Sequence, residues 1–113
     1  MVHQMRLQDA PFNSIKAGTK DIEMRLYDEK RRSIKPGDII EFTNIVTDEK
    51  VSATVYALHI FESFKDMYLA FNKERLGYKE SEIAHPQDMA KFYPEEEIKE
   101  FNVVGIEIRL IKQ

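Results

Sequence analysis

The sequence predicts an α+β domain in which short helices pack around a small mixed β-barrel. Two observations lead to this prediction. Segments in which apolar and polar residues alternate, as in half-buried strands, occur in the first third, the middle and the end of the chain. Between them lie short segments whose apolar residues are three or four positions apart, the spacing of an amphipathic helix. The 113 residues suffice for one hydrophobic core, so we expect a single domain spanning residues 1–113.

The first third of the chain is predicted to form a short helix and then a strand. Residues 9–17 begin with Asp9, a typical N-cap residue, and are followed by Gly18, a typical helix stop. Residues 21–26 alternate apolar and charged side chains, which predicts a strand. A charged loop through Ser33 and a Pro-Gly turn, of the type II geometry that glycine favours, lead onward.

The middle of the chain is predicted to form a β-hairpin and a helix. Residues 39–44 and 51–60 are rich in β-branched residues and are joined by a polar turn. Ser63 and Asp66 then resemble a capping box, and the helix that follows has one apolar face, which we expect to cover one end of the barrel.

The last third is predicted to hold two short helices and a closing strand. Pro86 and Pro94 each stand where a helix can begin, because proline is favoured in the first helical turn. Residues 103–111 are apolar and β-branched enough to close the sheet as its last strand.

The composition excludes several classes of chemistry. The chain has no cysteine, so a thiol nucleophile, a disulfide framework and a thiolate metal site are all excluded. His3, His59 and His85 lack the spacing of metal ligands, so we predict no metal and no other cofactor, and we expect His59 to be a hydrogen-bonded interior or rim residue. No apolar run approaches the roughly 20 residues of a membrane span, and we expect a cytoplasmic protein without a membrane partner.

The charge is unevenly distributed. The net charge of −3 argues against a protein that coats long duplexes by neutralising phosphates. Residues 1–35 nevertheless hold 8 basic and 5 acidic residues, a net of +3, which leaves −6 for the rest. The basic residues of a possible anion-facing surface are Lys16, Lys20, Arg25, Lys30, Arg31, Arg32 and Lys35. A solvated loop is the alternative for the three at positions 30–32.

A candidate site lies at the strand of residues 21–26. Glu23 and Arg25 share one face of this strand, and Lys20 joins them if the chain turns at Gly18. Two cations beside Glu23 favour its ionised form, lower its pKa and weaken it as a general base. Glu23 is therefore suited to accept hydrogen bonds from an exocyclic amine such as that of cytosine, while Lys20 and Arg25 suit a phosphate, carboxylate or carbonyl oxygen.

Tyr27 lies on the same face by strand parity and is the aromatic residue that we expect to stack on a bound base. An ion-pair network that only ties the barrel together is the alternative for Lys20, Glu23 and Arg25.

The motif Gly-x-Lys-x-x-Glu-x-Arg at residues 18–25, followed by a Pro-Gly-Asp turn at residues 36–38, resembles the ASCH family. Residues 92–98, leading into residues 103–106, are similar to the acidic helix and closing strand of bacterial members, so the resemblance covers nearly the whole chain. It implies a small β-barrel related to PUA domains, which bind RNA. Some members are reported as hydrolases of N4-acylated cytidine or as nucleases.

The sequence departs from the ASCH amidohydrolases at the chemistry. Their motif is similar to Gly-x-Lys-x-x-Thr-x-Arg, with the lysine as base and the threonine as nucleophile. Lys20 and Arg25 match this pattern, but Glu23 stands at the threonine position, so no hydroxyl is present to form an acyl-enzyme. The resemblance leaves a water-mediated route of hydrolysis, in which Lys20 or Glu23 acts on the water. Glu74 lies near the position at which those enzymes have their acid. The alternative for Glu74 is a solvated helix end.

We therefore favour an RNA- or nucleotide-binding module that uses a Lys/Glu/Arg cleft at the barrel, with RNA or a nucleoside or nucleotide as partner. The alternative is a small hydrolase of the ASCH type with catalytic Lys20, Glu23 and Glu74, acting on an acylated cytidine or on RNA without a threonine nucleophile.

Overall fold

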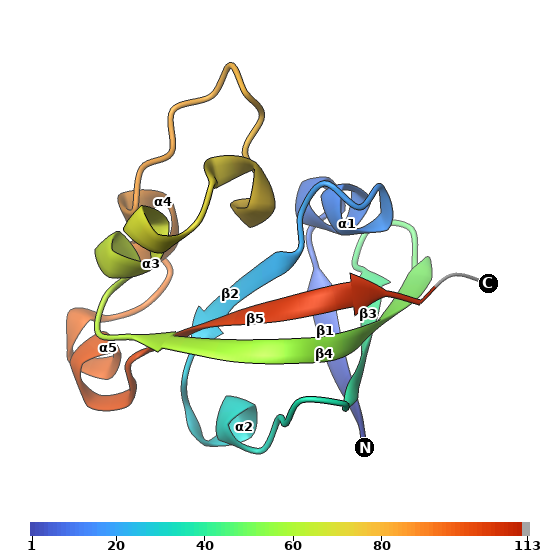
Figure 1. The fold of residues 1–113 in the computed structure, drawn as a ribbon, viewed down its shortest axis with the longest axis horizontal. Coiled ribbons are helices and arrows are strands. Elements are labelled where there is room, and N and C mark those ends of the chain that lie inside the picture. The colour runs from blue at the N-terminus through green and yellow to red at the C-terminus, as the bar shows by residue number, and fades with distance from the viewer. Residues whose placement is uncertain (112–113) are drawn as a thin grey trace.

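The computed structural model describes residues 1–111, so the last two residues of the predicted domain lie outside the described residues. It confirms the α+β prediction, with one mixed sheet and short helices around it (Figure 1). The strands are β1 (Val2–Leu7), β2 (Ile22–Leu26), β3 (Ile39–Asn44), β4 (Lys50–Phe61) and β5 (Val103–Leu110). The helices are α1 (Asp9–Lys16), α2 (Glu29–Arg32), α3 (Phe64–Ala70), the 3₁₀ helix η1 (Lys73–Leu76), α4 (Gln87–Ala90) and α5 (Glu95–Phe101).

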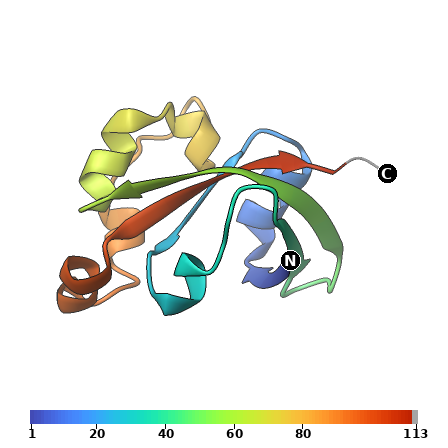
Figure 2. The ribbon, with the colours of Figure 1, turned by 60° about the horizontal axis from the view of Figure 1, so that its bottom comes forward.

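The sheet has the strand order β1-β3-β4-β5-β2, so β1 and β2 are its two edges. β1 pairs with β3 in parallel, and the other three pairs are antiparallel. The sheet curls into a half-barrel, which brings the two edge strands near each other without pairing them (Figures 1 and 2). A side chain bridges them instead, because Arg25 Nη2 on β2 donates to the Arg6 carbonyl oxygen on β1 at 3.2 Å.

Two apolar cores lie on the two faces of the sheet. The inner core joins α1 to the concave side, and the outer core joins α3 and η1 to the other side, as Figure 2 shows for α1 and α3. β2 contributes Ile22, Met24 and Leu26 to the outer core, as its alternation predicted. Glu23 and Arg25 consequently face inward toward β1.

Several local predictions are confirmed. β3 and β4 form the expected antiparallel hairpin. Ser63 caps α3, because its Oγ accepts from the Asp66 backbone N–H at 3.1 Å. In the Pro-Gly turn, Gly37 has a φ of 93° and the Asp38 N–H donates to the Lys35 carbonyl at 3.0 Å, as a type II turn requires. α4 and α5 begin directly after Pro86 and Pro94.

Three local predictions differ from the structure. β1 was not predicted, because only Met5 and Leu7 of its side chains are buried and the alternation is short. The loop through Ser33 contains α2, whose N-cap Asp28 accepts from the Arg31 backbone N–H. The N-cap of α1 is Gln8, not Asp9. The Asp9 carboxylate accepts instead from Asn44 Nδ2 at 2.9 Å and keeps its negative charge in the first helical turn.

Within residues 1–111, every helix is too short or too polar to span a membrane.

Candidate functional site

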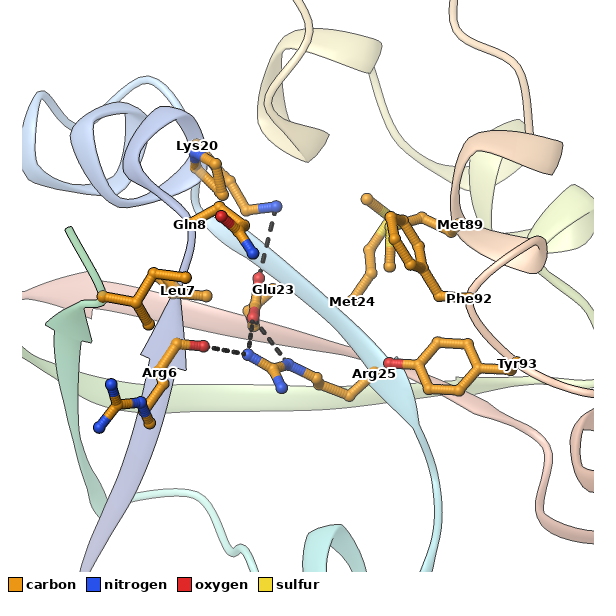
Figure 3. Close-up of a pocket in the computed structure, with 12 residues that line it drawn as sticks. Arg6, Leu7, Gln8, Lys20, Glu23, Met24, Arg25, Met89, Phe92 and Tyr93 are labelled. Carbon is orange, nitrogen blue, oxygen red and sulfur yellow. Dashed lines mark hydrogen bonds and ion pairs between the residues drawn. The ribbon is translucent and has the colours of Figure 1, made fainter.

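Lys20, Glu23 and Arg25 meet in one ion-paired cluster (Figure 3). Glu23 Oε2 accepts from Arg25 Nε at 2.8 Å, and Glu23 Oε1 lies 3.4 Å from Lys20 Nζ. The side chains of Lys20 and Glu23 are 6% and 5% exposed. The structure therefore brings together the three residues that the alternation and the Gly18 turn singled out.

The end of α1 explains why Lys20 reaches the cluster. Gly18 has a φ of 83°, which lets the chain reverse direction directly after the helix. The backbone N–H groups of Thr19 and Lys20 both donate to the Ser14 carbonyl, at 3.0 and 3.1 Å, and hold the reversed segment against the helix. Lys20 is thereby displaced from simple strand parity and turned toward Glu23.

The Lys20 side chain is buried beside η1. Its Nζ donates to the Leu76 carbonyl oxygen at 3.1 Å. Gly77, with a φ of 108°, follows that carbonyl, and a Cβ there would lie only 3.2 Å from Lys20 Cδ. An ammonium group has three hydrogens, and the Leu76 carbonyl and Glu23 engage two of them, which leaves one for a ligand.

Glu23 is ionised in this setting. Burial alone raises the pKa of Glu23, but attraction to Lys20 and Arg25 and hydrogen bonds from both outweigh it, so the pKa lies below its ordinary value. Near neutral pH the carboxylate is therefore an acceptor only and is a poor general base.

The cluster also has a structural role. Arg25 donates from Nε to Glu23 and from Nη2 to the Arg6 carbonyl, so one guanidinium connects the side chain of one edge strand to the backbone of the other. The expected tie across the barrel is thus present, and it lies at the same place as the candidate site.

A cavity of about 380 Å³ opens over the cluster, within the usual size range of small-ligand pockets. Figure 3 shows β1 residues on one side of Glu23 and Arg25, and Met89, Phe92 and Tyr93 on the other. Phe92 is 67% exposed at this cavity, whereas the Tyr93 ring stacks on Phe64 with 5.9 Å between centroids. The lining residues are Arg6, Leu7, Gln8, Pro11, Lys20, Glu23, Met24, Arg25, Ile45, Met89, Phe92 and Tyr93.

Tyr27 and Glu74, two further predicted site residues, do not line this cavity. The Arg32 guanidinium covers the Tyr27 ring at 4.5 Å from its centroid, so this face of the ring is occupied by the protein itself. Glu74 is exposed on η1. His59 is a hydrogen-bonded rim residue, as expected, because its Nε2 lies 2.9 Å from Glu107 Oε1.

The basic first third is largely engaged with the protein's own groups. Lys16 pairs with Glu49, and Arg31 pairs with Asp28 at 3.1 Å. Arg32 donates to two backbone carbonyls. Fewer of these cations are therefore available to contact an anion than the sequence predicted. Within the described residues, no group of three or more carboxylate or imidazole side chains is placed to hold a metal ion.

Part of the cavity wall was not expected from the sequence. Arg6 and Gln8 come from β1 and the cap of α1, and Phe92 comes from the segment between α4 and α5. The buried positions of Met5 and Leu7 alternate with polar residues, but this alternation is too short to predict β1. No periodicity marks Phe92.

Comparisons with known proteins agree with this fold. The ASCH domain family matches residues 5–112. The crystal structure of hypothetical protein PH0355 is 40% identical with a TM-score of 0.81, and the match covers 98% of this chain and 100% of that one. The solution NMR structure of protein PF0455 from Pyrococcus furiosus is 38% identical with a TM-score of 0.73, and the match covers both chains fully, at 100% each. A comparison with curated proteins gave no match.

Proposed function

This chain belongs to the ASCH domain family, and from that premise we propose that it binds a single nucleotide, free or within RNA, in the cavity over Lys20, Glu23 and Arg25. The observation that carries the proposal is an ionised, buried carboxylate held between two cations at a cavity of about 380 Å³. This arrangement places an acceptor between two donors in a space of ligand size.

The donor and acceptor pattern suits the polar edge of a base. Glu23 accepts from an exocyclic amine, and the free hydrogen of Lys20 or Arg25 donates to an adjacent ring nitrogen or carbonyl oxygen. Cytosine presents this combination of an amine beside acceptors. We therefore expect a base with an exocyclic amine to bind more tightly than one with a carbonyl in its place.

Phe92 takes the stacking role that the sequence analysis gave to Tyr27. Phe92 is 67% exposed at the cavity and offers a ring face for a base, with Lys91 Nζ lying 5.5 Å from its ring centroid. The ring of Tyr27 is covered by Arg32 and is less available for this role.

A purely structural tie accounts less well for these observations. Burying charged groups costs several kcal/mol per ion, and apolar side chains of similar volume often stabilise a protein as well as an ion pair does. A tie between β1 and β2 requires neither a buried lysine nor a cavity above it. Ligand binding gives both features a purpose.

Hydrolysis of an acylated base or of RNA is the less favoured alternative. The lowered pKa of Glu23 makes it a weak base, and Glu74 is outside the cavity, so the proposed water-mediated route lacks a well-placed acid. Release of acetate from N4-acetylcytidine, abolished by Lys20→Ala, would establish this alternative.

The proposal is tested by titrating labelled protein with cytidine 5′-monophosphate (CMP) and following amide shifts by NMR. We expect shifts centred on residues 19–25 and 89–93. Phe92→Ala should weaken binding by about tenfold, because base–aromatic stacking contributes about 1–3 kcal/mol, while its melting temperature stays unchanged. The matched control is Tyr56→Ala, which removes a ring that is 59% exposed away from the cavity. Equal affinity of the two variants would contradict the stacking role.

A further inference from the structure

The helix η1 is held to the chain just before β2 by backbone and side-chain hydrogen bonds. On the cavity side, Lys20 Nζ donates to the Leu76 carbonyl at 3.1 Å. One residue further along, the Asp21 backbone N–H donates to the Arg75 carbonyl at 3.1 Å. The last two residues of η1, Arg75 and Leu76, therefore accept hydrogen bonds from Asp21 and Lys20, respectively.

The Arg75 side chain also holds η1 to Asp21, on the outer side of the sheet. Its Nε and Nη2 donate to the two oxygens of Asp21 at 2.8 and 3.1 Å, a bidentate pair that fixes orientation as well as distance. The same Nη2 lies 3.1 Å from Glu107 Oε2 on β5, and the guanidinium lies 5.3 Å from the centroid of the Phe71 ring. Arg75 thus joins η1 to Asp21, just before β2, and to Glu107 on β5.

Glu107 is a rigid anchor for this arrangement. Its carboxylate also meets His59 Nε2 at 2.9 Å and Arg109 Nη1 at 3.0 Å. Burial alone raises the pKa of Glu107, but His59, Arg109 and Arg75 together lower it, so the anchor is ionised. β5 pairs with both β4 and β2, so the backbone at Glu107 is held by hydrogen bonds on both sides.

The position of the Lys20 ammonium depends on the Leu76 carbonyl, and the Leu76 carbonyl depends on η1. The four-carbon side chain of lysine is flexible, so its ammonium group needs a hydrogen-bond partner to stay in one place. Gly77 leaves room for that side chain, because a Cβ there would lie 3.2 Å from Lys20 Cδ. Within η1, Leu76 packs into the outer core, and Arg75 supplies the side-chain hydrogen bonds to the chain before β2.

We propose that Arg75 is a positioning residue of the candidate site, which fixes the Lys20 ammonium over Glu23 through η1 although Arg75 itself does not line the cavity. The effect of Arg75 on ligand affinity rests on the proposed nucleotide-binding function. Its effect on Lys20 does not, because that effect is present in the protein without ligand.

The first test observes the Lys20 ammonium directly, by NMR of its ¹⁵N-labelled side chain in the ligand-free protein. A buried ammonium that donates to a carbonyl exchanges its hydrogens slowly and gives a detectable signal. We expect Arg75→Ala to shift or abolish the Lys20 signal. In Arg75→Lys the signal should lie closer to that of the parent protein, because lysine keeps the charge but not the bidentate geometry of arginine. Asp21→Asn, which weakens the same fork without removing Arg75, should shift the signal in the same direction.

Arg109→Ala is the matched control. It removes a cation from the same Glu107 oxygen at nearly the same distance but does not touch η1. An unchanged Lys20 signal in Arg109→Ala, together with a changed one in Arg75→Ala, would support positioning through η1. A Lys20 signal unchanged in Arg75→Ala, or changed equally in both variants, would overturn it. Backbone amide spectra of β5 establish that each variant is folded.

The second test measures CMP affinity of the same variants. We expect Arg75→Ala to weaken binding by about tenfold and Arg109→Ala by less than about twofold, as for the loss of one charge-assisted hydrogen bond. If CMP binds to neither the parent protein nor the variants while the Lys20 signal responds as expected, positioning stands and the proposed nucleotide binding falls. If CMP binds the parent and Arg75→Ala equally, Arg75 has no role in the site.

Discussion

Glu23 is the residue on which both roles of the cluster depend. It holds Arg25, which bridges to β1, and it balances the charge of the buried Lys20. Its lowered pKa has a direct cause in those two cations, which overcome the opposing effect of burial. The same carboxylate is the acceptor that we propose reads an exocyclic amine. The proposed binding and the closure of the half-barrel therefore depend on the same side chain.

Glu23→Gln should consequently destabilise the protein. The substitution keeps the shape of the side chain but leaves two cations without their counter-charge, and breaking a buried ion pair typically costs about 3–5 kcal/mol. Urea denaturation at neutral pH measures the change in the free energy of unfolding. Glu41→Gln is the matched control, because Glu41 pairs with Lys50 at 3.4 Å on the exposed surface, where an ion pair contributes at most about 1 kcal/mol. Similar losses in the two variants would contradict the account of Glu23.

Among the secondary-structure elements, the turn at Gly18 determines how the chain passes from α1 to β2. Its φ of 83° reverses the chain so that Lys20 turns inward. Gly37 has a comparable φ of 93°, and a Cβ would meet no neighbouring atom within 4 Å at either glycine. The two glycines therefore share a positive φ but lie at different places in the fold.

This pair of glycines gives a controlled prediction. Gly18→Ala and Gly37→Ala should each lower the free energy of unfolding by about 1 kcal/mol, the cost of a left-handed conformation for a residue with a Cβ. Only Gly18→Ala should also weaken CMP binding, because it strains the turn that presents Lys20. Thermal denaturation and calorimetric titration measure the two effects. Loss of binding in Gly37→Ala, or full binding in Gly18→Ala, would contradict the role of the turn.

Elements with strong local signals were predictable, and those stabilised by distant contacts were not. The capping residue Ser63 and the hairpin of β3 and β4 follow from a few neighbouring residues, and the structure has both. β1 has only a short alternation, and its strand conformation depends on pairing with β3, which is more than 30 positions away. Tertiary pairing outweighs local propensity in such a strand.

The same distinction applies to the site. Alternation in β2 predicted that Glu23 and Arg25 share a face, and Gly18 indicated the turn that adds Lys20. Parity also placed Tyr27 on that face, but parity does not reveal what covers a ring, and Arg32 covers this one. The opposite wall, with Phe92, comes from a segment about 70 residues away in the sequence, so only the fold could bring it to the cavity.

The whole molecule should lose stability in acid through carboxylates that the fold holds ionised. A hydrogen bond with His3 and another from the Lys35 backbone N–H lower the pKa of Asp38 to about 2. Because the unfolded chain has the higher pKa, it binds protons first, so this contribution is complete above about pH 4 and is lost as the pH falls toward about 2. Glu23 acts in the same direction below its ordinary pKa.

Urea denaturation at a series of pH values tests this expectation. The free energy of unfolding should fall more steeply between about pH 4 and pH 2 in the parent protein than in Asp38→Asn, which has no carboxyl group to protonate there. Parallel curves for the two proteins would contradict the stabilising role of ionised Asp38.

At the scale of the molecule, the proposed recognition of a nucleotide depends on the cavity more than on surface charge. The net charge is −3, and several cations of the basic first third pair with acidic side chains or backbone carbonyls. The central claim is therefore that the Lys20, Glu23 and Arg25 cluster reads one base.

The most direct test compares the affinities of CMP and uridine 5′-monophosphate (UMP) by calorimetric titration of the parent protein. Cytosine has an amine at C4 and an acceptor at N3, where uracil has a carbonyl oxygen and an N–H. Ionised Glu23 accepts from the amine and repels the carbonyl, so we expect CMP to bind at least about tenfold more tightly, within the usual 1–3 kcal/mol of such discrimination. Equal affinities, or no binding of either nucleotide, would contradict the claim.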